Sequence, residues 1–191
     1  MPEANKIKFG LKNCKYAVCT IATNGTATYG SPKDLPGAVS LSMAAQGETN
    51  KFYADNIVYY VSTSNNGYEG DLELARVPED FLKDCLGYKV GGNSLVYDDA
   101  AAEPVHFALL FQFEGDAKAR RHVLYNCVAT RPDLASQTKA ENIEPQTESL
   151  AITASSIYVS AIDADVAHAY LNEGDTGYTT FLSTVTQPTH T

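Results

Sequence analysis

Basic residues and long apolar runs are both scarce in this sequence. Its 191 residues contain 14 lysines and arginines against 23 aspartates and glutamates, which gives a formal net charge of -9. Gripping DNA or an anionic membrane requires a basic face that releases counterions, so the composition argues against both. No segment approaches the roughly 20 apolar residues of a membrane span, and residues 1–6 lack the apolar core of a secretory signal. We therefore expect no membrane partner.

Paired cysteines are also missing. The four cysteines, Cys14, Cys19, Cys85 and Cys127, form no C-x-x-C pair and have no zinc-like spacing. In a chain with no visible secretory signal, we expect them to be reduced and packed as small hydrophobic residues. Metal binding or a disulfide is the alternative.

Catalytic signatures are absent as well. The sequence has no G-x-S-x-G, no P-loop, no H-E-x-x-H and no dinucleotide fingerprint. His106 and His122 would form a metal-binding pair only if their two segments paired in a shifted register, and we favour a structural role for both. We expect no catalytic residue, no metal and no cofactor, and hence a protein that is not an enzyme.

Strand signals dominate what is present. Hydrophobic residues make up 44% and charged residues 19%, which is typical of an ordered globular chain, and the length suits one core plus a tail. Runs rich in Val, Ile, Leu, Tyr, Ser and Thr alternate with turn residues. These runs are 15–21, 37–43, 57–64, 68–77, 95–97, 106–113, 122–130 and 148–154. The pattern predicts a mainly β fold, a two-sheet antiparallel sandwich or barrel-like domain.

One hairpin is predicted to the residue. Asn66-Gly67 separates two β-rich runs and suits a two-residue type I′ turn. This register places Val61 opposite Leu72 and Tyr59 opposite Leu74 on an apolar face. The polar face pairs Ser62 with Asp71, Ser64 with Glu69 and Tyr60 with Glu73.

The polar face of that hairpin carries three carboxylates, Glu69, Asp71 and Glu73, with no basic partner on the facing strand. A solvated outer face is the simpler interpretation. A surface that is anionic because function requires it is the alternative.

A helix and a second hairpin complete the predicted body. Residues 78–87 begin with proline and acids, end with glycine, and carry an apolar stripe that must pack on a sheet. Residues 106–113 and 122–129 flank a polar tip and are almost continuously apolar, so we expect central strands buried on both faces.

Two stretches lack a strong pattern. Residues 44–56 look like a long connection, and long ordered loops in compact domains usually have a function. No lysine or arginine follows Lys139, and threonine becomes frequent after Asp175. We therefore divide the chain into a β-domain, 1–154, and a C-terminal arm or small appendage, 155–191, which assembly would order.

Seven segments, in consistent order, carry a resemblance to a known family. They are residues 5–13, 52–56, 65–73, 108–116, 121–127, 129–132 and 143–148. Together they resemble the major tail tube proteins of long-tailed (siphovirus-type) bacteriophages that infect Gram-positive hosts. The resemblance covers residues 5–154, and the remaining tail departs from it.

The resemblance implies a β-sandwich-like domain with a flanking helix. Such subunits form rings, usually hexamers, that stack into a tube, and inner strands of neighbouring subunits continue one sheet around the lumen. The chain ends typically mediate contacts between rings. The tube houses the tape measure protein, joins tail-end proteins and conducts DNA during ejection without specific binding. The protein is expected in the virion tail, after assembly in the host cytoplasm.

The resemblance also suggests two functional surfaces. A conduit for DNA should not bind DNA, so an anionic lumen is preferable to a basic one. The candidate lumen-facing residues are Ser62, Ser64, Glu69, Asp71 and Glu73. The 44–56 connection would reach a neighbouring subunit or ring. Its candidate contact residues are Glu48, Lys51, Phe52, Tyr53 and Asp55.

The alternatives to a tube protein are a binding module and an enzyme. A carbohydrate- or receptor-binding β-sandwich of a virion needs an exposed aromatic platform, and the predicted register turns Tyr59 and Tyr68 toward the core, which leaves only Tyr60. An enzyme needs a concave site with convergent polar groups. The sequence displays neither feature.

Overall fold

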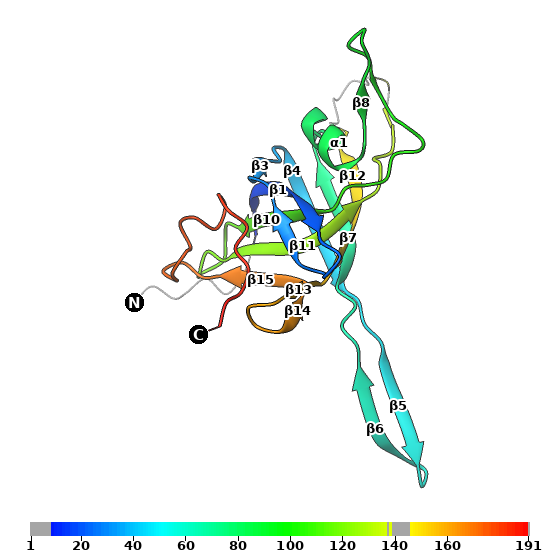
Figure 1. The fold of residues 1–191 in the computed structure, drawn as a ribbon, viewed down its shortest axis with the longest axis vertical. Helices are drawn as coiled ribbons and strands as arrows, with labels where there is room; N and C mark the ends of the chain where they lie inside the picture. Colours follow the sequence, from blue (N-terminus) through cyan, green and yellow to red (C-terminus); the bar gives the residue numbers. More distant parts are fainter. Residues whose placement is uncertain (1–8, 137, 139–145, 191) are drawn as a thin grey trace.

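The structure is a computed structural model that describes residues 9–136, 138 and 146–190 (Figure 1). Its strands are β1 Leu11–Ile21, β2 Ala27–Tyr29, β3 Lys33–Asp34, β4 Ala38–Ala45, β5 Thr49–Ala54, β6 Ile57–Thr63, β7 Tyr68–Leu74, β8 Lys89–Val90, β9 Val96–Tyr97, β10 Phe107–Phe113, β11 Arg121–Ala129, β12 Glu148–Ser155, β13 Ile157–Val159, β14 Ala164–Val166 and β15 His168–Leu171. The helix is α1 Glu79–Cys85. The expected mainly β, sandwich-like fold with one short helix is confirmed.

One large antiparallel sheet organises the body. Within the described residues, its main path runs β2-β1-β10-β11-β12-β7-β4, with β3 beside β1 and β15 beside β11. Three smaller antiparallel pairs, β5–β6, β8–β9 and β13–β14, stand apart from it. β4 therefore lies at one end of the path, where its only strand partner among the described residues is β7.

Two hydrophobic cores cover opposite faces of the central strands. The first lies under α1 and contains Tyr16, Phe81 and Phe107, together with inward-facing leucines of β7 and β12. The second contains Tyr125 from β11 and Phe181 from the C-terminal segment. All of β10 except its last residue is buried. The expectation that residues 106–113 and 122–129, here β10 and β11, form central strands buried on both faces is confirmed.

The predicted helix forms where its sequence signals place it. Pro78, with φ at -64°, precedes the first turn, and Gly87 follows the last turn with φ at +74°. Phe81 and Cys85 face the first core. Phe81 makes edge contacts with Tyr16 and Phe107, at ring-centroid distances of 5.0 and 5.2 Å.

The C-terminal segment packs against the body. β15 pairs with the first half of β11, and Phe181, Leu182 and Val185 belong to the second core. The Tyr125 hydroxyl donates a hydrogen bond of 2.7 Å to the carbonyl of Thr186. The division of the chain at residue 154 stays a sequence-based expectation.

The hairpin predicted at Asn66-Gly67 is wrong. β6 pairs with β5 across Asp55-Asn56, whose φ angles of 50° and 62° are those of a tight two-residue turn. Residues 44–56, expected as a connection, supply the end of β4, all of β5 and this turn. β5 and β6 form a ribbon that projects away from the body (Figure 1).

β7 takes different partners from the one predicted. It pairs with β4 on one side and with β12 on the other. Leu72 consequently lies opposite Leu41 and Leu150, whereas Val61 lies opposite Lys51 on the ribbon. A strand on each side of β7 surrounds the buried Leu72 and Leu74 with more apolar side chains than one exposed hairpin would, which is the physical reason for the difference.

All four cysteines are free and buried, as expected. Burial raises the pKa of the Cys14 and Cys85 thiols to about 12. The two histidines of the second hairpin do not meet. Nδ1 of His106 lies 2.6 Å from the side-chain oxygen of Asn126, whereas His122 contacts His168.

Candidate functional site

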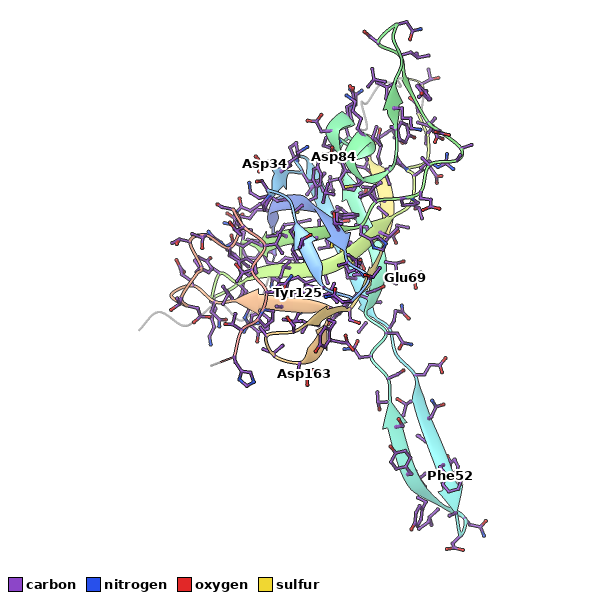
Figure 2. All side chains as sticks on the ribbon, in the orientation of Figure 1. Asp34, Phe52, Glu69, Asp84, Tyr125 and Asp163 are labelled. Carbon is purple, nitrogen blue, oxygen red and sulfur yellow. The ribbon has the colours of Figure 1, made fainter. Side chains whose placement is uncertain are left out.

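Two exposed features adjoin each other at the start of β7, where the chain returns from the β5–β6 ribbon to the body. The acidic strip consists of Glu69, Asp71 and Glu73 on β7, and the arm is the β5–β6 ribbon, residues 49–63. Figure 2 shows Glu69 near the base of the arm and Phe52 close to its tip. Within the described residues, no group of three His, Cys, Asp or Glu side chains could hold a metal ion. No helix in the same part of the chain is long and apolar enough to span a membrane.

The alternation of β7 creates the acidic strip. Leu72 and Leu74 are fully buried, so the residues between and before them point to the opposite face of the sheet. The six residues that face the carboxylates across the two ladders are small, and none is basic. They are Ser40, Ser42 and Ala44 on β4, and Ser149, Ala151 and Thr153 on β12. The result is a smooth anionic surface three strands wide.

Hydrogen bonds keep the last carboxylate of the strip ionised. Thr147 and Ser40 donate to the two oxygens of Glu73, the Ser40 bond measuring 2.9 Å. These bonds, that from Thr147 first, lower the pKa of Glu73 from its ordinary value. Glu73 therefore keeps its negative charge to lower pH than an ordinary glutamate does.

The structure separates the residues predicted for the lumen into two groups. Glu69, Asp71 and Glu73 share one exposed face, as the alternation predicted. Ser62 and Ser64 do not face them: Ser62 pairs with Asn50 on the arm, and the Ser64 hydroxyl accepts a 2.9 Å hydrogen bond from the Glu48 amide. The register inferred from the Asn66-Gly67 turn placed these serines wrongly.

Sequence reasoning missed the small residues that do flank the strip. A usable signal existed, because serine alternates with apolar residues at positions 40–43, and small residues alternate with buried ones at positions 149–154. What the sequence lacked was evidence that these two runs border β7. That pairing depends on tertiary contacts rather than on a local turn.

The arm exposes large apolar side chains. Phe52 and Tyr53 on β5 are 62% and 61% exposed, and Tyr59 and Tyr60 on β6 are 71% and 62% exposed. Tyr59 was expected to face the core, and that prediction is wrong. Of the predicted contact residues, Lys51, Phe52 and Tyr53 lie on β5.

The base and the tip of the arm hold the other two predicted contact residues. Asp55 lies in the turn at the tip, and Glu48 lies at the base. Close backbone approach at the base requires glycine. A Cβ on Gly47 would lie 2.2 Å from the carbonyl oxygen of Ser64. Gly67 has φ at +87°, and a Cβ on it would lie 2.0 Å from the carbonyl oxygen of Ala154. The base is thus tightly joined to β12 and the body.

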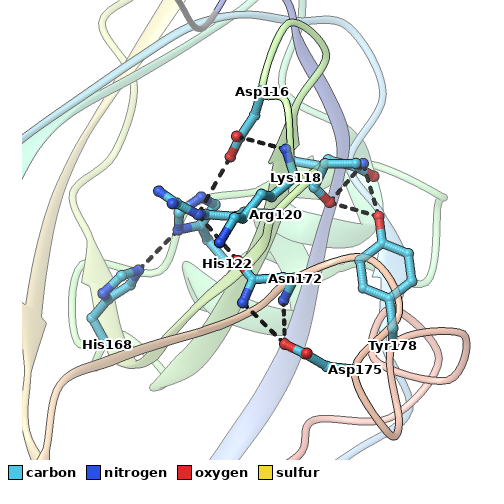
Figure 3. A network of polar contacts seen from close by, with 10 residues as sticks. Asp116, Lys118, Arg120, His122, His168, Asn172, Asp175 and Tyr178 are labelled. Atoms are coloured by element: carbon cyan, nitrogen blue, oxygen red, sulfur yellow. Dashed lines mark hydrogen bonds and ion pairs between the residues drawn. The ribbon is translucent and has the colours of Figure 1, made fainter. Parts of the chain in front are cut away.

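A polar network ties the C-terminal segment to the β10–β11 tip (Figure 3). The Tyr178 hydroxyl donates a 2.6 Å hydrogen bond to the carbonyl of Ala119, and Arg120 contacts Asn172 and Asp116 at 3.3 and 3.7 Å. Nδ1 of His122 lies 3.1 Å from Nε2 of His168, whose pKa is lowered by burial. The network holds two segments together and presents no nucleophile beside a base.

The described residues thus form a β-sandwich body with a smooth anionic face and a projecting ribbon that exposes apolar side chains. A family model described as phage tail tube protein matches residues 2–182, so the chain belongs to the phage tail tube protein family. No curated protein matches the chain. The family match confirms the resemblance to major tail tube proteins and extends it through most of the C-terminal segment. The chain is a structural protein of the bacteriophage tail.

Proposed function

We propose that copies of this chain polymerise into stacked rings, six copies to a ring, which form the tail tube through which the genome is ejected. The observation that carries this proposal is the acidic strip, an exposed anionic face on a strand one position from the end of the sheet. The implied partners are further copies of the chain, the tape measure protein and tail-end proteins. The virion tail is the expected location, assembly takes place in the host cytoplasm, and a Gram-positive host stays a prediction.

The position of β4 supports closure of the strip into a ring. Among the described residues β4 pairs only with β7, so its other side offers unpaired N–H and C=O groups to a further strand. A strand supplied by a neighbouring copy would satisfy these groups and extend the same face. Repeating that step around an axis closes the sheet and removes the edge altogether.

The charge of the strip suits a channel for DNA. Lysine or arginine side chains facing the channel would release counterions from the phosphates and hold the DNA in place. Carboxylates flanked by serine, alanine and threonine do the opposite, because they repel phosphates and leave no bulky side chain in the path. The strip therefore favours transit over binding.

The arm is the proposed contact with other copies, through Phe52 and Tyr53. Aromatic side chains are enriched among the few residues that dominate interface energies. A two-stranded ribbon is at best marginally stable when surrounded by water, so its apolar residues gain most from burial against a partner.

The arm exposes more aromatic residues than the sequence indicated, which is the observation that favours the alternative of a carbohydrate- or receptor-binding module. Phe52 pairs with Tyr60, whereas Tyr53, the next residue of β5, pairs with Val58, so Phe52 and Tyr60 lie on one face of the ribbon and Tyr53 lies on the other. That arrangement gives no single flat platform against which a sugar ring could stack. The tube accounts for both the arm and the acidic strip.

Electron microscopy of the concentrated, purified chain tests the proposal. We expect rings or regular tubes whose number increases with protein concentration. A chain that stays monomeric at all concentrations, and binds a glycan instead, would contradict the tube and support the module.

A further inference from the structure

The two faces of the arm are both apolar in its outer half. Residues paired across a ladder share a face, and successive residues alternate between faces except at a bulge. Phe52 and Tyr53 are successive residues of β5 and so lie on opposite faces, whereas the register shift between them leaves Tyr59 of β6 without a partner in the ladder. Tyr53 pairs with Val58 on one face, and Phe52 pairs with Tyr60 on the other. Nearer the base the pairs are polar: Thr49 with Thr63, and Asn50 with Ser62.

Neither face is covered by the body. The side chains of the two outer pairs are between 44% and 62% exposed. A strand whose two faces are both apolar is normally buried on both sides, whereas a strand that packs on one surface alternates between apolar and polar residues. A ribbon lying on the surface of a single partner would leave one aromatic face in water. The pattern is therefore that of a ribbon inserted between two surfaces.

The area of one face is too small to hold two copies together. A large aromatic side chain carries about 150–250 Å² of surface, and the side chains of each outer pair are about half exposed, so one face offers about 200 Å². A stable interface needs about 800 Å² from each partner. One face alone therefore supports only a transient contact, and both faces together come closer to the requirement.

We propose that the arm of each copy is clamped between two other copies of this chain, one on the Tyr53–Val58 face and one on the Phe52–Tyr60 face. This inference rests on the proposed assembly into a tube and specifies how the arm takes part in it. Two copies in solution can bury only one face of an arm. A third copy buries the second face, so growth is cooperative and small oligomers are scarce.

Photo-crosslinking tests the clamp directly. A photoreactive residue replaces either Tyr53 or Tyr60 in the full-length chain, and crosslinked products are mapped after assembly at high concentration. We expect both positions to join the arm to another copy, at two different surfaces, and a chain carrying both groups to yield three-chain products. Crosslinks from one position only, or from both positions to the same surface, would overturn the clamp while leaving the tube intact. Assembly with no crosslink to another copy from either position would show that the arm is not a contact, whereas a chain that does not assemble at any concentration would contradict the tube itself.

Matched face variants supply a second readout. Tyr53→Thr with Val58→Thr alters one face, and Phe52→Thr with Tyr60→Thr alters the other, both retaining good strand formers. The control is Thr49→Ser with Thr63→Ser near the base. Each face variant should raise the concentration needed for assembly at least about tenfold, as loss of interface anchors does, and the control should leave it unchanged. Assembly of either face variant at the concentration found for the unaltered chain would refute the two-sided contact.

Discussion

At the scale of the residue, the acidic strip follows from alternation that the sequence displays. Acidic residues alternate with Leu72 and Leu74 along this segment, so the sequence predicts that the acids lie on one face of the strand and the leucines on the other. The identity of the facing residues could not be predicted. Ser40 and Ser149 lie more than thirty and seventy positions from Glu73 in the chain, and only the pairing of β4 and β12 with β7 brings them together.

Replacing the acids tests the role of the strip. The triple variant Glu69→Gln, Asp71→Asn, Glu73→Gln should fold and assemble normally, because Glu69 and Asp71 are exposed and a glutamine in place of half-buried Glu73 keeps its size and an oxygen that can accept from Ser40 or Thr147. Loss of repulsion toward phosphates should slow the release of DNA from virions at low salt, where charges are least screened. The measurement is the rate of DNA release from purified particles. A rate equal to that of unaltered particles would show that the strip does not govern transit.

His168 should make stability depend on pH. Burial lowers its pKa below the ordinary value of 6.5, so between the lowered pKa and 6.5 the unfolded chain binds more protons than the folded chain. The free energy of unfolding should therefore be highest above pH 6.5 and decrease as the pH falls toward the lowered pKa. The slope is at most about 1.4 kcal/mol per pH unit.

Urea unfolding between pH 7.5 and 5 measures this dependence. His168→Gln keeps a polar group near the Nε2 position but does not titrate, so its stability should change less steeply with pH. The exposed His190→Gln serves as the control and should follow the unaltered chain. Equal slopes for the His168 variant and the unaltered chain would exclude His168 as the cause.

At the scale of the element, the positions of most strands and of the helix could be predicted, but the partners could not. All eight predicted strand segments overlap observed strands, and α1 lies within the predicted 78–87 range. The wrong partner was predicted for β7 because two turns compete in this part of the sequence. Asn66-Gly67 is the stronger local signal, and Gly67 does adopt a positive φ, but it does so at the base of the arm. Asp55-Asn56 makes the turn because it lets β7 join two strands of the body.

The pairing of β4 with β7 gives a prediction at this scale. A Cβ on Gly70 would lie 1.8 Å from the carbonyl oxygen of Ser42, so Gly70→Ala forces the two strands apart. We expect the free energy of unfolding to fall by about 2 kcal/mol, as overpacking in a rigid site does. Gly92→Ala is the control, because no heavy atom lies within 4 Å of its added Cβ. Denaturant unfolding of both variants makes the comparison, and equal stabilities would contradict the close packing of β4 on β7.

The arm gives a second prediction at this scale. Phe52→Ser with Tyr53→Ser removes an aromatic side chain from each face of the ribbon. Because neither side chain packs on the body, the melting temperature should change by less than about 2 °C. Assembly should be lost. Sedimentation of the concentrated variant measures this, and normal tubes would show that the arm is not a contact.

At the scale of the whole molecule, the proposed assembly depends on two features of a single copy, the end strand β4 and the arm. Among the residues that the structure describes, the end strand β4 pairs on one side only, and the arm projects a ribbon with exposed apolar side chains away from the body (Figure 1). The C-terminal segment is different, because it contributes Phe181 and Val185 to a core of the same copy. Its weak strand pattern explains why sequence reasoning gave it no place in the body.

The most direct test of the central claim is a cryo-electron-microscopy reconstruction of the assembled tail at a resolution that shows side chains. The account predicts that Glu69, Asp71 and Glu73 of every copy face the channel, with β4 paired to a strand of the neighbouring copy. A reconstruction in which these carboxylates lie on the outer surface of the tail, or are buried between rings, would contradict it.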